Sequence, residues 1–419
     1  MPDSQPQPPS SSSPPPGPAD RTTLLLCGAR LADGRRVDVR LGGGRIEAVG
    51  TSGSLTAAPA AVRGARVDLT GHLLLPAPAE PHAHADTALS ADTDGPASAE
   101  PQDVQRRATE AALLQLGHGA TAQRAHVRVG DVQGLATLGA VLQARRALRG
   151  LVELTTVAVP RLLTGLAGAD GLAMLRDAMK MGASVVGGCP DLDPDPTGYV
   201  EAVLDIASEH GCPVDLHTHA ADPARLARLA AMSGGLRPGV ALSPCAGLDR
   251  VPAEVAGRTA DQLAAAGVSV VCLPQGGCGG VEDRGTAPVR LLRAAGVRLA
   301  AGSGALRDVS NPVGRGDPLE AAYLLASRYG LRPSDAYDAV GCSARAVLGL
   351  PEVRVEAGFP ADLLAVRGDR LAGALSLAYS RIVVHGGRVV SRTSAVREFC
   401  DSAAATDRGL PRQGRKEPS

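Results

Sequence analysis

The sequence predicts an α/β fold: a (β/α)8 TIM-type barrel with a small discontinuous β-sandwich domain formed from both chain ends. Eight short apolar or β-branched runs alternate with helical stretches of about 12–16 residues in the middle of the chain. Short β-rich runs with glycine turns stand before and after this region. The length of 419 residues suits one large barrel or two domains, and a doubly wound sheet is the alternative arrangement of the same units.

Composition divides the chain into four parts. Residues 1–20 are rich in Pro, Ser and Gln, and we expect them to form a disordered tail, as we do for residues 396–419. The β-sandwich is predicted over residues 21–75 and 352–395, and the barrel over residues 76–351. The sandwich runs are TTLLLCGARL, RRVDVRLGGG, RIEAVG and RVDLTG on the N-terminal side, and ADLLAV and SRIVVHGGRVV on the C-terminal side.

Eight runs are assigned to the barrel strands. In chain order they are HLLLPAPAEP from His72, TAQRAHVRV from Thr121, VELTTVAV from Val152, SVVGGCP from Ser184, PVDLHTH from Pro213, GVALSP from Gly239, VSVVCLP from Val268 and VRLAAGS from Val297. Stretches such as PQDVQRRATEAALLQLG between them have apolar residues at helical spacing. In such a barrel the active face lies at the C-terminal ends of the strands.

Charge and composition exclude several classes of partner. Lys plus Arg and Asp plus Glu are both 43, so the formal net charge of zero gives no electrostatic reason to expect nucleic acid or an anionic membrane. No apolar run approaches the roughly 18 residues of a membrane span, and the N-terminus does not resemble a signal peptide. The eight scattered cysteines indicate free thiols in a reducing, cytoplasmic compartment. We therefore expect a small-molecule ligand.

Five of the nine histidines fall at predicted strand ends. His82 and His84 are spaced i, i+2 after the first barrel run, and His217 and His219 repeat this spacing at the fifth. His126 ends the second run. Two histidines spaced i, i+2 on an extended segment project to the same side, so both imidazoles can reach one ion. This pattern predicts a metal site at the barrel rim.

Eight segments carry a family resemblance. They are GRIEAVG (Gly44–Gly50), LLLPAPAEPHAHADT (Leu73–Thr87), QRAHV (Gln123–Val127), VAVP (Val157–Pro160), MGASVVGGCP (Met181–Pro190), PVDLH (Pro213–His217), GFPADLLAV (Gly358–Val366) and VVHGGRVV (Val383–Val390). Over about residues 22–393 the chain resembles the amidohydrolase superfamily, and within it the cytosine deaminase-like group. The resemblance implies a barrel with one divalent metal, zinc or iron, that polarises a water for attack on a ring amide or amidine carbon. It implies that His82, His84 and His217 are the metal ligands.

Three positions depart from the family pattern. Ala220 stands where the family has a proton-shuttling Glu, Pro244 where it has a His after strand six, and Gly304 where it has an Asp that is both ligand and base. Single acid or base groups contribute about 10²–10⁴ in rate. The resemblance therefore implies a member that is impaired or inactive in the standard deamination.

Two interpretations stay open. The first is a binding or regulatory pseudoenzyme with a partial metal site. The second is a hydrolase of non-peptide C–N bonds with a rebuilt three-histidine site, in which His219 or Asp308 supplies the base. The alternatives for these two residues are that His219 faces solvent and that Asp308 caps the next helix.

Candidate ligand-binding residues are Arg124, His126 and Arg161, at or near the ends of strands two and three. Two arginines together can clamp a carboxylate or phosphate, which would make the ligand anionic. The alternative is that each arginine is solvated or bonded to the backbone. The sequence neither requires nor excludes a homo-oligomer.

Overall fold

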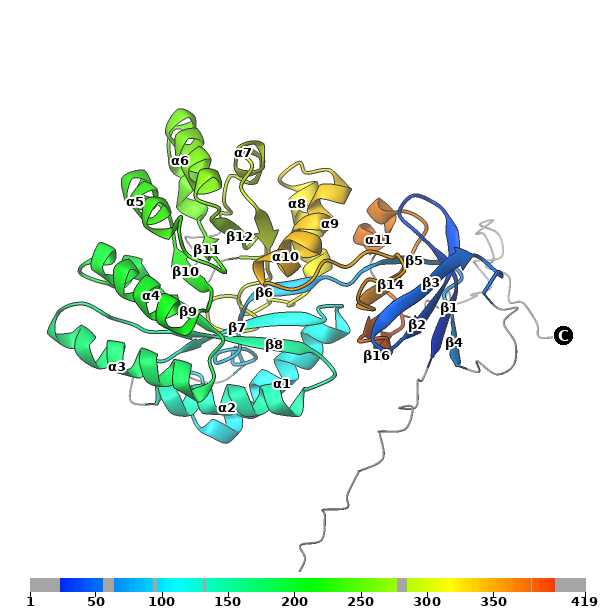
Figure 1. Cartoon of the computed structure of the whole chain (residues 1–419), viewed down its shortest axis with the longest axis horizontal. Coiled ribbons are helices and arrows are strands. Elements are labelled where there is room, and N and C mark those ends of the chain that lie inside the picture. The colour runs from blue at the N-terminus through cyan, green and yellow to red at the C-terminus, as the bar shows by residue number, and fades with distance from the viewer. Residues whose placement is uncertain are drawn as a thin grey trace, which may run out of the picture.

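The computed structural model describes residues 23–55, 64–92, 96–130, 133–276, 285–377 and 379–395. The two predicted disordered tails lie outside these residues. The described chain forms two eight-stranded sheets, one closed into the barrel and one beside it (Figure 1). The predicted barrel and the second β domain from both chain ends are thus confirmed.

The smaller sheet is mixed, with strand order β16-β15-β14-β5-β1-β2-β3 and β4 paired to β1. Its strands are β1 Leu24–Arg30, β2 Arg36–Gly42, β3 Arg45–Thr51, β4 Ala65–Asp68, β5 His72–Pro76, β14 Leu363–Arg367, β15 Arg381–His385 and β16 Arg388–Thr393. Strand β5 pairs antiparallel with β14, which joins the two ends of the chain. A helix, α11 (Leu371–Leu377), lies between β14 and β15, where we predicted only strands.

The barrel sheet is parallel, and its strands follow one another in chain order. They are β6 Ala79–His84, β7 Ala122–Arg128, β8 Glu153–Val159, β9 Val185–Gly188, β10 Val214–Thr218, β11 Val240–Pro244, β12 Ser269–Cys272 and β13 Leu299–Ala301. The first and last strands meet through a bridge between Ala83 and Gly304. Gly302 allows this approach, because a Cβ there would lie 2.7 Å from Glu80 Oε1. The Glu80 carboxylate accepts hydrogen bonds from the backbone N–H groups of His82 and Ser303.

One predicted strand is in fact two. The run from His72 was assigned wholly to the barrel, but its first part is β5 of the smaller sheet and its second part is β6 of the barrel. Pro76 and Pro78 flank the break, and a proline has no N–H for a sheet ladder. The chain therefore passes from one domain to the other within this short segment.

A helix follows every barrel strand, and these helices surround the strands in Figure 1. They are α1 Pro101–Gly117, α2 Gly134–Ala147, α3 Gly165–Met181, α4 Pro196–His210, α5 Pro223–Ser233, α6 Ala253–Ala265, α7 Val289–Ala294 and α8 Pro318–Ser327. Helices α4, α5 and α8 each begin with Asp-Pro, where the aspartate accepts backbone N–H bonds of the first turn and proline takes the first helical position. Short 3-10 turns, η1 (Pro190–Leu192) and η2 (Ala246–Arg250), precede α4 and α6.

Two further helices, α9 (Pro333–Val340) and α10 (Cys342–Val347), complete the barrel. Ala344 of α10 and the following Leu348 are buried with Ala79 and Ala122, the first residues of β6 and β7. Helix α10 therefore covers the N-terminal end of the barrel, and the opposite end carries the candidate site.

Candidate metal and ligand site

Four imidazoles meet at the C-terminal ends of the barrel strands. His82 and His84 come from β6, His126 from β7 and His217 from β10. Their ring centroids are 4.1 to 5.6 Å apart. The extended backbone of β6 projects His82 and His84 to the same side, as the i, i+2 spacing predicts.

Three of these imidazoles have the spacing of metal ligands. The Nε2 atoms of His82 and His84 are 3.2 Å apart, and those of His84 and His217 are 3.4 Å apart. Two nitrogens bound to one tetrahedral zinc at about 2.0–2.1 Å would be about 3.3–3.4 Å apart. Possible ligand atoms of all three side chains lie within 4.8 Å of one another, so this group can hold a divalent ion.

Strand β11 orients the first of these ligands. The Nδ1 atom of His82 is 3.0 Å from the Ser243 hydroxyl oxygen. A proton on Nδ1 donated to Ser243 leaves the Nε2 lone pair directed toward His84 and His217. Such a partner on the second ring nitrogen is a usual feature of metal-binding histidines.

Burial keeps the imidazoles of His82, His84 and His217 neutral. Burial lowers the pKa of His84 to about 4, assisted by the neighbouring His126, while Asp86 and Asp308 act in the opposite direction. Burial and the other imidazoles hold the pKa values of His82 and His217 well below the usual range. Neutral imidazole is the form that binds metal, so the site is preset for an ion at neutral pH.

A buried chain of charges lies below the cluster. Arg124 donates a 2.8 Å hydrogen bond from Nη1 to Asp215 Oδ2, and Asp215 Oδ1 is 3.3 Å from His126 Nε2. Burial would raise the pKa of Asp215, but His126 and Arg124 together lower it. His82, His126 and Asp215 also form a possible metal-ligating group. This second group fits an ion poorly, because the Arg124 guanidinium already supplies the cation beside Asp215.

A cavity of about 440 Å³ opens above the imidazoles. Its described lining comprises His84, His126, Arg128, Gly130, Val159, Pro160, Arg161, Cys189, Leu192 and His217. None of these residues carries a carboxylate. Burial raises the pKa of the Cys189 thiol to about 11, which leaves this side chain protonated and a poor nucleophile at neutral pH.

The two-arginine clamp predicted from Arg124 and Arg161 does not form. Arg161 lines the cavity, but Arg124 is almost fully buried and donates to Asp215 and to the Val347 carbonyl. The reason is that β7 continues to Arg128. Arg124 and Arg128 project to the same side of the strand, and Arg124 lies four residues nearer its start. Arg128 was not among the predicted ligand-binding residues, although its i, i+2 spacing from His126 places both side chains on the same face of the strand.

The two predicted bases lie outside the cavity lining. The His219 ring packs against Gly247 of η2, whose added Cβ would lie 2.5 Å from His219 Cδ2. Asp308 is buried, and its carboxylate accepts hydrogen bonds from the Thr87 hydroxyl and from the backbone N–H groups of Ser310 and Asn311. Asp308 therefore closes a turn. It does not cap α8, whose N-cap residue is Asp317.

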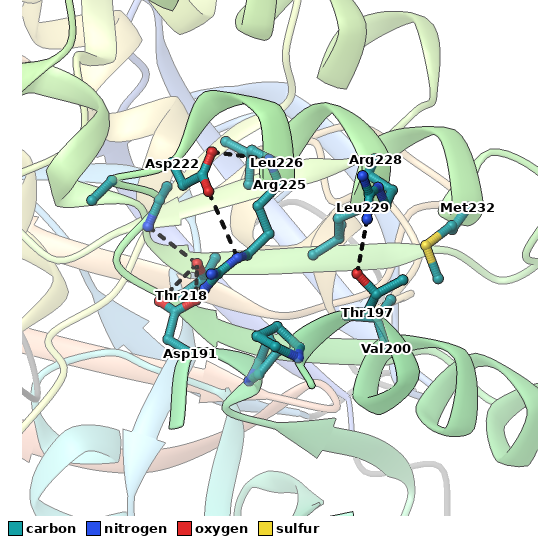
Figure 2. A pocket seen from close by; sticks show the side chains of 14 residues that line it. Asp191, Thr197, Val200, Thr218, Asp222, Arg225, Leu226, Arg228, Leu229 and Met232 are labelled. Atoms are coloured by element: carbon teal, nitrogen blue, oxygen red, sulfur yellow. Dashed lines mark hydrogen bonds and ion pairs between the residues drawn. The ribbon is translucent and has the colours of Figure 1, made fainter. Parts of the chain in front are cut away.

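The three substituted positions place no acid or base beside the imidazoles. Ala220 is buried with a left-handed backbone and lines a separate cavity against α5, shown in Figure 2. Pro244 ends β11. Gly304 also has a left-handed backbone, with φ of 69°, and a Cβ there would lie 2.9 Å from the Gly276 carbonyl oxygen. The local backbone at Gly304 thus favours glycine.

Comparison with known proteins identifies the class. The model of the amidohydrolase family matches residues 96–391, so the chain belongs to this family. Among curated relatives, the chain is 28% identical over 315 residues to a pterin deaminase of Rhizobium rhizogenes, covering 70% of each chain. It is 24% identical over 313 residues to N-isopropylammelide isopropyl amidohydrolase of Pseudomonas sp., covering 70% of this chain and 75% of the relative.

Solved structures agree with this assignment. N-isopropylammelide isopropylaminohydrolase from Burkholderia multivorans superposes with a TM-score of 0.79 and 28% identity, over 90% of this chain and 100% of the other. A 5-methylcytosine deaminase from Klebsiella pneumoniae has a TM-score of 0.77 at 23% identity, over 90% and 100% of the two chains, and shares the fold. The resemblance to the cytosine deaminase-like group is confirmed. The helices of the described residues include none with the length and apolar character to cross a membrane.

Proposed function

We propose that this chain binds one divalent metal ion, zinc or iron, through His82, His84 and His217, and lacks the standard deamination of its family. In this proposal it binds a small ring compound in the cavity beside these imidazoles. The supporting observation is that the site has candidate metal ligands but lacks a carboxylate acid or base in its described cavity lining. Three imidazoles have metal-ligand spacing, but the described cavity lining includes no carboxylate to transfer protons.

The two halves of the proposal rest on different chemistry. A bound ion would activate a water for attack on an amide or amidine carbon of the ligand. Hydrolysis also requires a group that takes a proton from the attacking water and delivers one to the leaving nitrogen. Ala220, Pro244 and Gly304 have no titratable side chain. The chain therefore retains candidate ligands for the ion that would activate the water, without the usual groups for proton transfer.

A second candidate function is hydrolysis of a ring C–N bond with rebuilt proton transfer. His126 lines the cavity within the imidazole cluster, and the Asp308 carboxylate is close enough to His84 to oppose the lowering of its pKa by burial. Either group could replace the missing acids after a small rearrangement. His219 is a weaker candidate because its ring packs against Gly247.

One experiment separates these functions. The purified chain is reconstituted with zinc or iron, its metal content is measured, and release of ammonia or amine is followed with cytosine, a pterin and N-isopropylammelide. The matched control is His84→Ala. We expect about one ion per chain and no release above that of the control. Release above the control that disappears in Asp308→Asn or His126→Gln would establish the second function, and absence of metal after reconstitution would refute the metal site.

A further inference from the structure

We propose that the ligand of this cavity is an anion: a ring compound whose carboxylate or phosphate substituent is bound by Arg128 and Arg161. The inference rests on the proposed function in one respect, since the same cavity is taken to hold the ring beside His84 and His217. It goes further by assigning the chemical class of the ligand and two residues that select it.

The two arginines stand at adjacent strand ends. Arg128 is the last residue of β7 and is in register with Val159, the last residue of β8. Arg161 follows two residues later, and both side chains line the same cavity. Neighbouring strands lie about 4.8 Å apart, so the two guanidinium groups extend from neighbouring points on the rim.

A glycine fixes the position of Arg161. A Cβ added to Gly130 would lie 2.5 Å from the Cβ of Arg161 and 2.6 Å from its backbone nitrogen. The segment after β7 therefore passes directly against the segment after β8, and only glycine leaves room for this contact. The arrangement holds Arg161 at the cavity wall even though its side chain is exposed.

The side chains that can carry a positive charge in the described lining of this cavity are arginines and histidines. Asp86 Oδ2 accepts a 2.9 Å hydrogen bond from Arg128 Nε, which orients that guanidinium. Within the described part of the chain, Arg161 has no hydrogen-bond or ion-pair partner. The described lining of the cavity thus contains two guanidinium groups and no carboxylate. Guanidinium groups match carboxylate and phosphate oxygens through bidentate hydrogen bonds, so a ligand anion would complement this lining.

The neighbouring cavity in Figure 2 differs from this one in the charges of its lining residues. It also contains two arginines, but Arg225 forms ion pairs with two aspartates. The distances are 3.7 Å from Arg225 Nη1 to Asp191 Oδ1 and 3.9 Å from Arg225 Nε to Asp222 Oδ2. Arg228 donates to the Thr197 hydroxyl at 3.3 Å. Acids of that cavity's own lining balance its positive charge. We therefore assign anion selection to the cavity above the imidazoles, and Arg225 provides a matched control.

The test measures binding by isothermal titration calorimetry of the full chain at low salt, with two matched pairs of probes. Orotate and uracil share a ring and differ in a carboxylate, whereas uridine 5′-monophosphate and uridine differ in a phosphate. We expect the anionic member of at least one pair to bind roughly tenfold to a hundredfold more tightly than its neutral partner. The pair that shows the preference identifies the anion. Arg161→Gln should remove most of the preference, whereas Arg225→Gln should preserve it.

The outcomes also separate this inference from the proposed function. The anion preference should persist in metal-free His82→Ala, because the arginines do not depend on the ion. If that variant and the reconstituted chain hold no metal but keep the preference, the metal site is wrong and the anion site stands. Equal affinity within both pairs, or no detectable binding by any probe, would overturn the inference. Persistence of the preference in the Arg128→Gln/Arg161→Gln double variant would also overturn it.

Discussion

Arg124 and Asp215 form an ion pair inside the barrel, with 2.8 Å between Nη1 and Oδ2 and side chains that are 1% and 0% exposed. The pair joins β7 to β10 beneath the imidazole cluster. Arg124 also donates to the Val347 carbonyl of α10, so one side chain connects the barrel wall to the helix that covers its N-terminal end.

Removing one member of this pair should destabilise the fold strongly. Asp215→Ala leaves the Arg124 charge buried without its partner, and we expect a loss of about 3–5 kcal/mol in the free energy of unfolding. Urea denaturation measures this loss. The double variant Arg124→Met/Asp215→Ala should recover part of the loss, since no buried charge remains. A single variant within about 1 kcal/mol of the native chain would contradict this account.

The metal site should depend on the imidazole cluster alone. We expect about one zinc or iron per chain by elemental analysis of the native protein, and loss of that ion in His82→Ala, because two remaining imidazoles bind weakly. His210→Ala is the matched control, because His210 is an exposed residue at the end of α4. Equal metal content in the two variants would show that the ion binds elsewhere.

The metal-free protein should lose stability as the pH falls from 6.5 to 5. The unfolded chain takes up protons on His84 near the ordinary histidine pKa of 6.5, whereas the folded chain does so only near pH 4. The unfolded state therefore binds more protons in this window. The free energy of unfolding decreases as the pH is lowered from 6.5 to 5, by about 1.5 kcal/mol for His84 alone. Denaturation curves at each pH measure the slope. His84→Asn should reduce the slope, and an unchanged slope would rule out this origin.

The small sheet is anchored to the barrel through Arg381 of β15. Its guanidinium makes two hydrogen bonds to Asp317, of 2.8 and 2.6 Å, and one to the His118 carbonyl. We expect Arg381→Ala to cost about 3 kcal/mol, because it removes the charged partner of the largely covered Asp317 carboxylate and leaves it, among the described residues, only the backbone N–H bond at the start of α8. Arg388→Ala is the control. It also removes a bond from the small sheet to the barrel, but this bond is exposed and should be worth less than about 0.5 kcal/mol.

Tyr199 links the loops around the cavity. Its hydroxyl donates to the Pro160 carbonyl at 2.8 Å and accepts from the Cys189 N–H at 3.1 Å. Tyr199→Phe leaves both groups unsatisfied, so we expect a loss of about 1–3 kcal/mol in thermal or urea denaturation. Tyr323→Phe, at a 45% exposed position, should change stability by less than about 0.5 kcal/mol. Similar losses in the two variants would argue against this bridging role.

Much of the fold could be predicted because the local patterns agree with the tertiary structure. Strands buried on both faces read as apolar runs, and surface helices show helical spacing, so the barrel follows from their alternation. The predicted proximity of the His82 and His84 imidazoles is also confirmed, because both residues lie on one strand two positions apart. The break after Pro76 was missed because an unbroken apolar run does not show which sheet each half joins.

The ligand-binding side chains were less predictable. Arg124 and Arg128 have the same side-chain type and the same strand face, and only the length of β7 decides which one reaches the cavity. The setting of Asp308 depends on Thr87, which lies more than two hundred residues earlier in the chain. No local pattern records such a contact.

The pairing of β5 with β14 has a consequence for synthesis. Translation delivers the N-terminal strands of the small sheet first, but their partner β14 emerges only after the entire barrel has left the ribosome. Until then one side of β5 is an open edge, exposed to pairing with other chains. The barrel can begin to fold in the meantime, and the small sheet is completed last, when β14 pairs with β5.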